Sequence, residues 1–285
     1  MQATTQTLVR VRKMQPEDIP AGRELSRQQE WPHRAVDWEF LFRQGSGFVA
    51  ELDGQIVGTT MIWPYGTDAA NLGMVIVSGE VQGQGIGRRL MEAALDALGD
   101  RNVRLNSTEE GRPLYTKLGF QPVGRIHQHQ GLVDAIPLIA LRPNERVRPA
   151  GKNDYATIAE LDRRAQGVDR SKLIAAILET PRGIIFDSNN SPVGFAVLRR
   201  FGRGFSVGPT VAPDALAAKA LISHWLGSKA GKFCRIDVPE SSGLSPWLEE
   251  LGLPRVGGVT TMIRGKPFPA AADAKVFSLV NQALG

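Results

Sequence analysis

One stretch of the chain, EVQGQGIGRRLMEAALDAL (residues 80–98), limits the available folds more than any other. It places Gly83, Gly85 and Gly87 at alternate positions, directly before an amphipathic run with helical spacing of apolar residues. The apolar stretch NLGMVIVSG (71–79) precedes it and predicts a strand. Glycines let another molecule approach the main chain, and the free N–H groups that open a helix favour anions. The stretch therefore predicts an α/β fold with a phosphate-binding loop between a strand and a helix.

The spacing of these glycines excludes two familiar nucleotide-binding loops. A Walker loop needs Gly-Lys followed by Ser or Thr, whereas Gly87 is followed by Arg88 and Arg89. The dinucleotide fingerprint needs glycines at positions one, three and six after the first strand of its unit. Here they stand at positions one, three and five, after the fourth expected strand. A different phosphate-binding fold is required.

The elements around the loop follow an alternating order in the first half. Apolar alternation and turn residues, including the Asp53-Gly54 hairpin turn, predict strands at 7–13, 47–52, 55–62, 69–78, 102–107 and 121–130. Helices are expected to begin at Pro16 and to cover 34–43, 88–98 and 112–118. This pattern indicates a mixed sheet flanked by helices.

Two motifs in this order resemble those of the GNAT superfamily of N-acetyltransferases. QGQGIG (82–87) resembles the Gln/Arg-x-x-Gly-x-Gly/Ala loop that cradles the pyrophosphate of acetyl-coenzyme A, and PLYTKLGF (113–120) resembles the Leu-Tyr-x-x-Leu-Gly-Phe helix. Further stretches resemble a bacterial branch of tandem GNAT proteins: WPHR (31–34), LGMVIV (72–77) and LNSTEEGRPLYTKLGF (105–120). The resemblance implies the α/β (α+β) GNAT fold, a mixed and mostly antiparallel sheet flanked by helices.

The resemblance also implies a site for acetyl-coenzyme A as co-substrate. Val75, Ile76 and Val77 would pair with the pantetheine arm through their backbone, and one N–H would stabilise the thioester oxygen. The residues that would face the pyrophosphate are Gln82, Gly83, Gln84, Gly85, Ile86, Gly87 and Arg88. Tyr115 occupies the position from which a phenol can protonate the departing thiolate. The alternative for Tyr115 is a half-buried aromatic that holds its short helix against the sheet.

No residue stands out as the general base that an amine acceptor would need. The strand at 71–77 carries no carboxylate, and Glu80 at the loop edge is expected to be solvated. The candidates left open are Glu51, His33 and Asp37, or water relayed to bulk solvent. Many family members carry an asparagine seven residues before the tyrosine, where this chain has Thr108, with Asn106 two residues earlier. Neither of these two is assigned a role.

The second half repeats the plan of the first. LYTKLGFQPVGR (114–125) and WLEELGLPRVGG (247–258) share a helix, a Leu-Gly stop and a Val-Gly pair, and Asp18 and Asp154 lie at a similar offset. Matching offsets at both ends of a segment predict an internal duplication. The boundary is expected in the Pro- and Arg-rich stretch 140–151, which divides the chain into an N-terminal GNAT domain (1–143) and a degenerate GNAT-like domain (144–285).

The second domain is expected to have lost its cofactor site. The stretch VGPTVAPDAL (207–216) keeps Gly208-Pro209 but no Gly-x-Gly series, and proline removes a backbone N–H. Leu248 aligns with Tyr115. The domain would then shape the acceptor pocket or form a dimer contact, or serve only as a scaffold, with Trp225 and Trp247 in its core. The final segment, 267–285, is expected to end in an amphipathic helix.

Composition narrows the partners. The net charge is +5 and the sequence pI about 9.5, but the basic residues form no run of five, so nucleic-acid binding is kept only as a minor alternative. The single cysteine, Cys234, excludes an intramolecular disulfide, and the four scattered histidines predict no metal site; His127 and His129 are expected on a solvated strand face. No signal segment or membrane span is apparent, so a cytoplasmic protein without a membrane partner is expected.

These features predict an N-acetyltransferase that moves an acetyl group from acetyl-coenzyme A to a primary amine of a small molecule or peptide. Direct attack in a ternary complex is expected, because the first domain has no cysteine to form an acyl-enzyme. The missing base motivates an alternative, a non-catalytic acyl-coenzyme A sensor or interaction module. The acceptor stays open, since the acceptor-side segment (28–46) is aromatic and mixed in charge.

Overall fold

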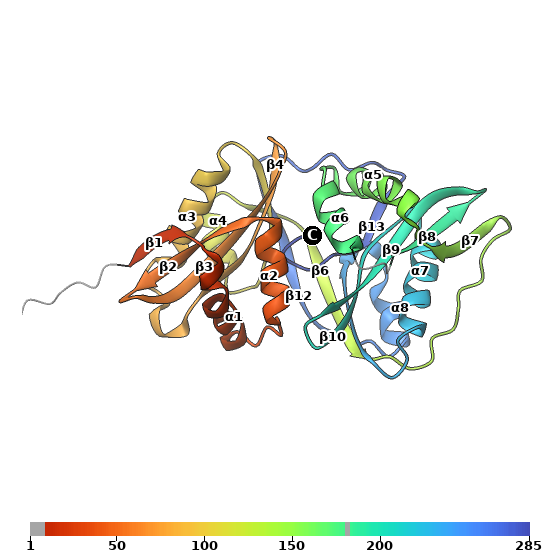
Figure 1. The fold of residues 1–285 in the computed structure, drawn as a ribbon, viewed down its shortest axis with the longest axis horizontal. Coiled ribbons are helices and arrows are strands. Elements are labelled where there is room, and N and C mark those ends of the chain that lie inside the picture. Colours follow the sequence, from red (N-terminus) through yellow and green to blue (C-terminus); the bar gives the residue numbers. More distant parts are fainter. Residues whose placement is uncertain (1–8, 180–182) are drawn as a thin grey trace, which may run out of the picture.

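The computed structural model describes residues 9–179 and 183–285. Within these ranges the strands form one sheet of thirteen strands in the order β1-β2-β3-β4-β5-β12-β6-β11-β10-β9-β8-β7, and β13 adds to β10 (Figure 1). Most neighbours are antiparallel, while β4 with β5 and β10 with β11 are parallel. The predicted mixed, mostly antiparallel sheet flanked by helices is confirmed.

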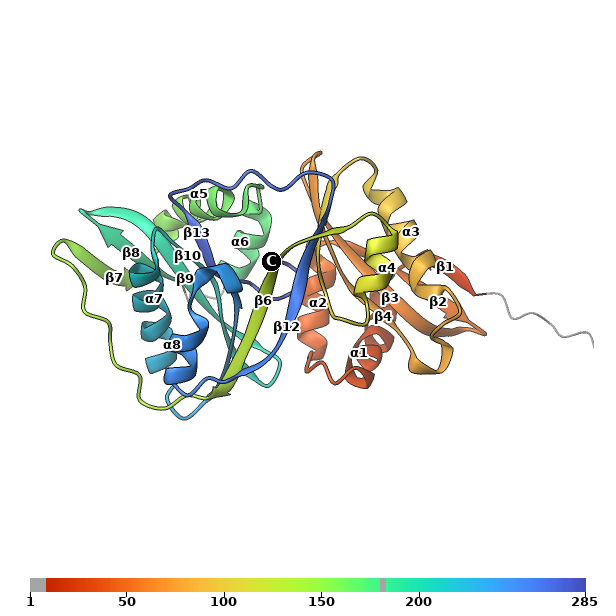
Figure 2. The same cartoon turned by 180° about the vertical axis from the view of Figure 1, so that it is seen from behind.

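Within the described residues, the first half contains six strands and four α-helices. The strands are β1 (Arg10–Lys13), β2 (Ser46–Leu52), β3 (Gln55–Tyr65), β4 (Ala69–Val77), β5 (Asn102–Ser107) and β6 (Gln121–Leu132). The helices are α1 (Ile19–Gln28), α2 (Ala35–Gln44), α3 (Ile86–Leu98) and α4 (Arg112–Lys117), with 3-10 turns η1 (Pro16–Asp18) and η2 (Gly79–Val81). Successive residues of a strand face opposite sides of a sheet. Met61 and Trp63 therefore pack with α1 and α2, whereas Ile62 packs with α3 and α4 on the other face (Figures 1 and 2).

The second half follows the same order and adds one strand. Its strands are β7 (Glu145–Pro149), β8 (Gly183–Ser188), β9 (Ser191–Phe201), β10 (Gly204–Ala212), β11 (Phe233–Pro239), β12 (Arg255–Arg264) and β13 (Lys275–Ser278). Its helices are α5 (Tyr155–Gln166), α6 (Ser171–Leu178), α7 (Ala215–Gly227) and α8 (Ser245–Glu250), with 3-10 turns η3 (Lys152–Asp154) and η4 (Glu240–Ser242). Trp225 and Trp247 pack against the core of this half, as predicted.

Side-chain contacts repeat along with the elements. Arg12 pairs with Asp18 at 2.7 Å and with Glu51 at 2.8 Å, which ties β1 to η1 and to β2. Arg148 makes the same two contacts with Asp154 and Asp187, both at 2.8 Å. All three residues of the second set lie 136 positions after their counterparts. The duplication therefore extends from the order of the elements to individual ion pairs.

The two halves exchange strands at the centre of the sheet. Strand β12 of the second half lies between β5 and β6 of the first, with Thr261 opposite Asn106 on one side and opposite Gly124 on the other. In return β6 pairs with β11 along Ile126–Leu132. The chain between β6 and β7 contains the predicted boundary at 143/144, yet the sheet is continuous across both halves. Separating them would break three strand pairings, β5 with β12, β12 with β6, and β6 with β11.

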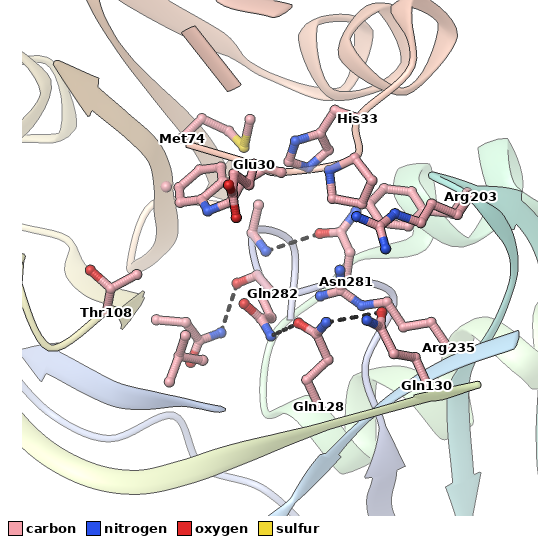
Figure 3. Close-up of a pocket in the computed structure, with 17 residues that line it drawn as sticks. Glu30, His33, Met74, Thr108, Gln128, Gln130, Arg203, Arg235, Asn281 and Gln282 are labelled. Carbon is pink, nitrogen blue, oxygen red and sulfur yellow. Dashed lines mark hydrogen bonds between the residues drawn. The ribbon is translucent and has the colours of Figure 1, made fainter. Parts of the chain in front are cut away.

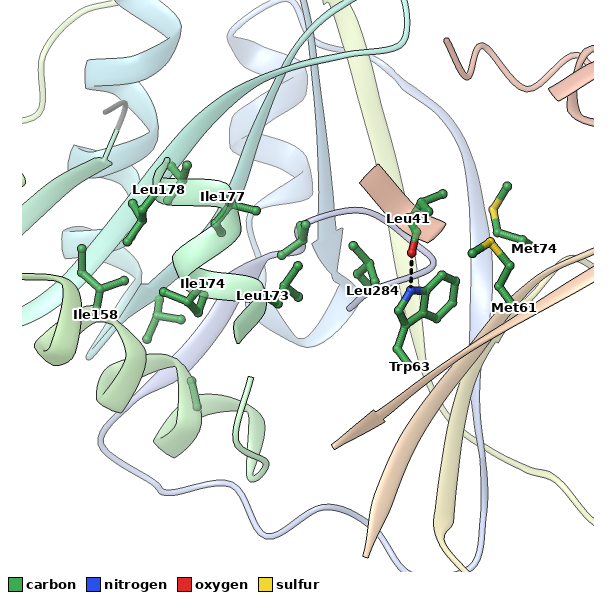
Figure 4. Close-up of a cluster of buried hydrophobic side chains, with 14 of the residues drawn as sticks. Leu41, Met61, Trp63, Met74, Ile158, Leu173, Ile174, Ile177, Leu178 and Leu284 are labelled. Carbon is green, nitrogen blue, oxygen red and sulfur yellow. Dashed lines mark hydrogen bonds between the residues drawn. The ribbon is translucent and has the colours of Figure 1, made fainter. Parts of the chain in front are cut away.

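The C-terminal segment does not form the expected amphipathic helix. Residues 275–278 form β13, which pairs with β10, and the chain then turns. The side chain of Asn281 accepts the N–H groups of Ala283 and Leu284, at 3.0 and 2.9 Å, so it stabilises a turn in place of a helix. Leu284 then packs in a core cluster shared by both halves, between Trp63 of the first and Leu173 of the second (Figure 4).

The two strand histidines also depart from expectation. His127 and His129 are buried on β6, where both contact the hydroxyl of Ser245 on α8, at 2.8 and 3.0 Å. This face was expected to be solvated, and that prediction is wrong because α8 of the second half covers it. Among the described helices, none has the length and apolar character needed to cross a membrane.

Candidate active site

The predicted cofactor strand diverges from its neighbour. Strand β4 pairs with β5 only from Ala69 to Asn71, and no pairing between them continues beyond Asn71. A cavity of roughly 700 Å³ opens at this point, between β4, β5, the glycine loop and α4. We call it the loop cavity. Because β5 has moved away, one edge of the remaining strand faces this cavity without a neighbouring strand.

The glycine loop has the backbone of an anion cradle. Gly83 and Gly85 have φ angles of 80° and 77°, a left-handed conformation that favours glycine, and no atom lies within 4 Å of a Cβ placed on either. Gln82 donates its side-chain N–H to the carbonyl of Val77 at 3.1 Å and so braces the loop. Gly85 is the N-cap of α3 and supplies no side-chain cap, which leaves the first N–H groups of the helix free for a ligand.

The predicted cofactor residues gather around this cavity, with one exception. Those that line it are Val75, Ile76, Val77, Gln82, Gly83, Gly85, Ile86, Gly87 and Arg88. Gln84 is exposed on the loop and does not line the cavity. Arg88 is exposed as well and pairs with Glu92 one turn along α3, at 2.7 Å. The main chain of the loop therefore dominates the cavity wall, with few charged side chains.

Tyr115 is placed both as a packing aromatic and as a residue of the cavity wall, the two alternatives expected for its position. Its ring packs against Phe120 with centroids 6.2 Å apart, and the residue is 7% exposed, so it holds α4 against the sheet. It also lines the loop cavity beside Gly111, where an added Cβ would lie 3.3 Å from the phenol oxygen. Burial raises the pKa of Tyr115 well above its usual value. The phenol is therefore protonated at neutral pH and can act as a proton donor.

A bulge in β4 marks the inner end of the loop cavity. Pairing with β3 passes from Thr59 opposite Ile76 to Met61 opposite Gly73, so two residues of β4 face one of β3. Met74 has a φ of +52°, which is uncommon for a residue with a side chain, and its carbonyl accepts a 2.9 Å hydrogen bond from the hydroxyl of Thr59. Such strain is often found at functional sites.

A second cavity of roughly 200 Å³ adjoins the first at this bulge, and Figure 3 shows the residues that line it. Five residues line both cavities: Trp31, Gly73, Met74, Asn106 and Thr108. The rest of its wall comes from the α1–α2 connection, from β6, from the end of β9 and the β9–β10 turn, from β11, from β12 and from the C-terminal segment. We call it the interface cavity, because both halves of the chain build it.

Two residues at the junction are held by hydrogen bonds, Asn106 across the halves and Thr108 within the first half. Asn106 donates to the carbonyl of Gln282 and accepts from the hydroxyl of Thr261, both at 2.7 Å. The hydroxyl of Thr108 accepts from the N–H of Gly111 at 3.3 Å, at the start of α4. The role of Asn106 could not be assigned from the sequence, since its partners come from the second half.

The three candidate bases occupy different environments. Glu51 on β2 is held by Arg12 at 2.8 Å, and Asp37 is held by Arg34 at 2.6 Å; neither lines either cavity. Burial alone would raise the pKa of Asp37, but hydrogen bonds from Arg34 and from the N–H of Gly202 lower it. His33 lines the interface cavity, where burial and Arg235 lower its pKa to about 4. None of the three is placed and poised as a base.

Sequence reasoning missed one carboxylate. Among the residues that line the interface cavity, Glu30 is the only acid, and it precedes the junction residue Trp31. The signal that could have found it is positional, since it follows α1 at the point where the chain turns towards the sheet. No group of three or more His, Cys, Asp or Glu residues within 9–179 and 183–285 could hold a metal ion. Cys234 is buried on β11 in the second-half core.

The place in the second half that corresponds to the loop cavity is filled. Strands β10 and β11 pair only at Phe205 and Ser206, and β13 occupies the space beyond, bonded to β10 and to Asp237 on β11. Gly208-Pro209 lies within a strand and not in a loop, because β10 continues to Ala212 and only two residues connect it to α7. One of these, Asp214, caps α7 by accepting the N–H of Ala217 at 2.9 Å.

Comparison with known proteins agrees with this architecture. Two family models, each described as an acetyltransferase (GNAT) domain, match residues 43–122 and 158–278. The uncharacterised N-acetyltransferase YitH of Bacillus subtilis (strain 168) is 25% identical over 279 residues, which cover 96% of this chain and 97% of YitH. The chain belongs to the GNAT superfamily of acetyltransferases and carries two GNAT domains in tandem.

Solved structures show the same fold over the whole chain. A putative acetyltransferase from Pyrococcus horikoshii superimposes with a TM-score of 0.78 at 20% identity and covers 100% of both chains. A tandem GNAT protein from the clavulanic acid biosynthesis pathway gives a TM-score of 0.65 at 14% identity, over 91% of this chain and 99% of its own. The tandem arrangement is therefore shared by proteins of very different sequence.

Proposed function

We propose that this protein transfers an acetyl group from acetyl-coenzyme A to a primary amine of a small molecule or peptide. The observation that carries the proposal is the junction of the two cavities at the Met74 bulge. The loop cavity extends from the glycine loop to this bulge, and its loop N–H groups and free strand edge suit a pyrophosphate and its pantetheine arm. The interface cavity begins there, so an acceptor in it would meet the thioester directly.

The reaction in this arrangement is a direct displacement. The amine nitrogen attacks the thioester carbonyl carbon, a C–N bond forms, and the C–S bond breaks to release coenzyme A as a thiolate. An ammonium acceptor loses two protons overall: one is balanced by protonation of the thiolate, and the other passes to solvent. The strand edge at Val75–Val77 supplies backbone N–H donors for the oxygen that gains charge during attack. No cysteine lies along this route, because Cys234 is buried on β11.

Tyr115 is the proposed proton donor to the thiolate. Its phenol stays protonated at neutral pH and lines the loop cavity, while its ring is already fixed against Phe120. A fixed donor loses little conformational freedom when the ligand arrives. No second protein group is needed for this half of the proton transfer.

One cofactor site per chain is the corresponding proposal for the two domains. Residues 1–143 would bind acetyl-coenzyme A, while residues 144–285 would complete the wall of the interface cavity. This is supported by β13 and Asp214, which occupy the space and the helix start that a second cofactor would need. A carboxylate at a helix N-terminus also disfavours a second anion there.

The test is an acyl-transfer screen across primary amines, read as thiol release from acetyl-coenzyme A. With a substrate identified, Tyr115→Phe should lower kcat by about 100-fold, because it removes the proton donor. Affinity for acetyl-coenzyme A should be retained, since the ring and its packing remain. Tyr155→Phe removes a phenol that bonds the carbonyl of Leu178 far from both cavities, and it serves as the control.

Two outcomes would contradict the proposal. Unchanged turnover in Tyr115→Phe would remove its role as the acid. Tight binding of acetyl-coenzyme A without thiol release for any amine would favour the alternative, a non-catalytic acyl-coenzyme A sensor, which the lack of a poised base among Glu51, Asp37 and His33 motivates.

A further inference from the structure

We infer that the acceptor is a small zwitterion, whose ammonium group binds Glu30 beside the thioester and whose carboxylate binds Arg203 at the far end of the interface cavity. This inference rests on the proposed function, because it assumes that acyl transfer takes place at the junction of the two cavities. It goes further by assigning opposite charges of the acceptor to opposite ends of one cavity.

Glu30 is held at the cavity by an unfavourable backbone. It follows α1 with a φ of +58°, and the N–H of Trp31 returns to the carbonyl of Ser26 at 2.9 Å. This helix-ending turn favours glycine at the position that Glu30 occupies. Its side chain has no hydrogen bond or ion pair within the described residues and is exposed at the cavity. A strained residue with a free carboxylate is better explained by a ligand than by stability.

Cationic groups lie at the opposite end. Arg203 and Arg235 line the interface cavity, and Figure 3 shows both across it from Glu30 and Met74. Arg235 already forms a two-point ion pair with Asp237, at 2.9 and 3.0 Å. Arg203 has no ion pair or hydrogen bond to any described residue, so its charge is available to a ligand.

The turn that carries Arg203 is fixed against the first half. Asp37 accepts the N–H of Gly202 at 3.1 Å, and Arg34 donates to the carbonyl of Arg200 at 2.9 Å. The backbone at Arg203 is therefore held in place relative to the first half, which carries Glu30. Opposite charges across one cavity can select a ligand by the separation of its own charges.

The surface between the two ends is polar and uncharged. Gln282 donates to Gln128 at 3.2 Å, Gln128 donates to Gln130 at 3.2 Å, and Gln282 also reaches Asp237 at 3.1 Å. Trp31 and Phe201 supply apolar walls. Such a lining suits the body of an amino acid or a related compound. It does not suit a polyamine, because a second ammonium group would face Arg203.

The experiment compares matched acceptors. For alanine, methionine and phenylalanine, each free amino acid is tested against its carboxamide and its decarboxylated amine, with acetyl-coenzyme A and thiol release as the readout. We expect kcat/KM for the free amino acid to be at least tenfold higher than for the matched carboxamide in one or more series. Arg203→Gln should reduce this ratio to about one, chiefly through KM for the amino acid. Arg200→Gln, on the neighbouring exposed arginine outside the cavity, should keep the ratio.

Glu30 is tested through two variants that should have the same effect on activity and different effects on stability. Glu30→Gln should lower kcat/KM at least tenfold for every amine, because the ammonium group loses its partner. Glu30→Gly should lower it equally but raise Tm by about 2 °C, since glycine relieves the backbone strain. If both variants keep full kcat/KM, Glu30 has no role in binding the acceptor.

The outcomes separate this inference from the proposed function. Equal turnover of amino acids, carboxamides and simple amines would overturn the zwitterion while leaving acyl transfer intact. A preference that survives Arg203→Gln would also overturn it. If acetyl-coenzyme A binds but no amine gives thiol release, the proposed function is overturned and this inference with it.

Discussion

The two halves of this chain share a frame and differ in what fills it. In each, a central strand pairs in parallel with its neighbour for two or three residues and then separates, at Asn71 in the first half and at Ser206 in the second. Beyond Asn71 lies an open cavity lined by backbone and a glycine loop. Beyond Ser206 lies β13, which uses the free strand edge for its own hydrogen bonds. An exposed strand edge readily pairs with another strand, and here the protein supplies that strand itself.

The comparison shows that architecture and ligand site can be inherited separately. The ion pairs Arg12–Asp18 and Arg148–Asp154 are repeated in both halves, so the scaffold has been kept in detail. The loop has been shortened to two residues, and Asp214 caps the helix in place of Gly85. The second half instead contributes β12, Arg203 and the C-terminal segment to the site of the first. In the proposed function, one half binds the donor and the other shapes the space beside it.

The largest expected effect distinguishes the starts of α3 and α7. Gly85→Glu places a carboxylate and a strained side chain at the opening of α3, so affinity for acetyl-coenzyme A should fall by more than 100-fold, measured by isothermal titration calorimetry. Asp214→Ala at the start of α7 is the matched control. It should leave that affinity unchanged and cost about 1 kcal/mol of unfolding free energy, because it removes a helix cap. Loss of binding in Asp214→Ala would contradict the assignment of one site.

The contact between the halves should weaken in mild acid. His33 sits between Trp38 of the first half and Phe201 of the second, and its folded pKa of about 4 lies below its unfolded value of 6.5. The unfolded chain therefore binds more protons between these values, so the His33 contribution is complete above pH 6.5 and is lost as pH falls towards 4. This contribution to the unfolding free energy is at most about 3 kcal/mol.

Urea unfolding at a series of pH values measures this term. His33→Gln should flatten the slope of unfolding free energy between pH 6.5 and 4. Asp37 does not interfere in this window, because its lowered pKa moves its own titration to more acid conditions. An unchanged slope in His33→Gln would mean that the histidine is not held neutral between the halves.

A smaller effect on stability is expected where the C-terminal segment passes β10 in the second half. A Cβ on Gly208 would collide with the carbonyl oxygen of Leu279, so Gly208→Ala should cost about 2 kcal/mol as the tail is displaced. Gly83→Ala is the matched change in the first half, where no atom is near and only the left-handed φ is strained, at about 1 kcal/mol. Equal costs in denaturant unfolding would show that the tail does not pack tightly in this place.

The loop and the local elements could be predicted from the sequence because their signals are local. Glycine spacing, the strand before it and the helix after it all lie within about thirty residues. The strand exchange could not be predicted, since the sequence pattern of β12 does not reveal that its neighbours are β5 and β6. The tail was misread because its apolar residues suit a helix or a strand, and only β10 and Asn281 decide between them.

The acceptor side was the least accessible to sequence reasoning. Glu30, Gln128, Arg203 and Gln282 come from four separate elements, and the exchange of strands brings them to one cavity. Glu30 lies in a turn after a helix, and Arg203 lies in a two-residue connection between strands. Neither position has a distinctive sequence pattern. The proposed donor site consists of residues close together in the sequence, whereas the proposed acceptor site depends on how the two halves fit together.

The central claim is that two GNAT domains make one working cofactor site, and the stoichiometry of acetyl-coenzyme A binding tests it most directly. Isothermal titration of the full chain should give one site per chain, and Gly85→Glu should leave none. Two sites per chain, or one site that survives Gly85→Glu, would contradict the account, because the cofactor would then have to bind where β13 and Asp214 now lie.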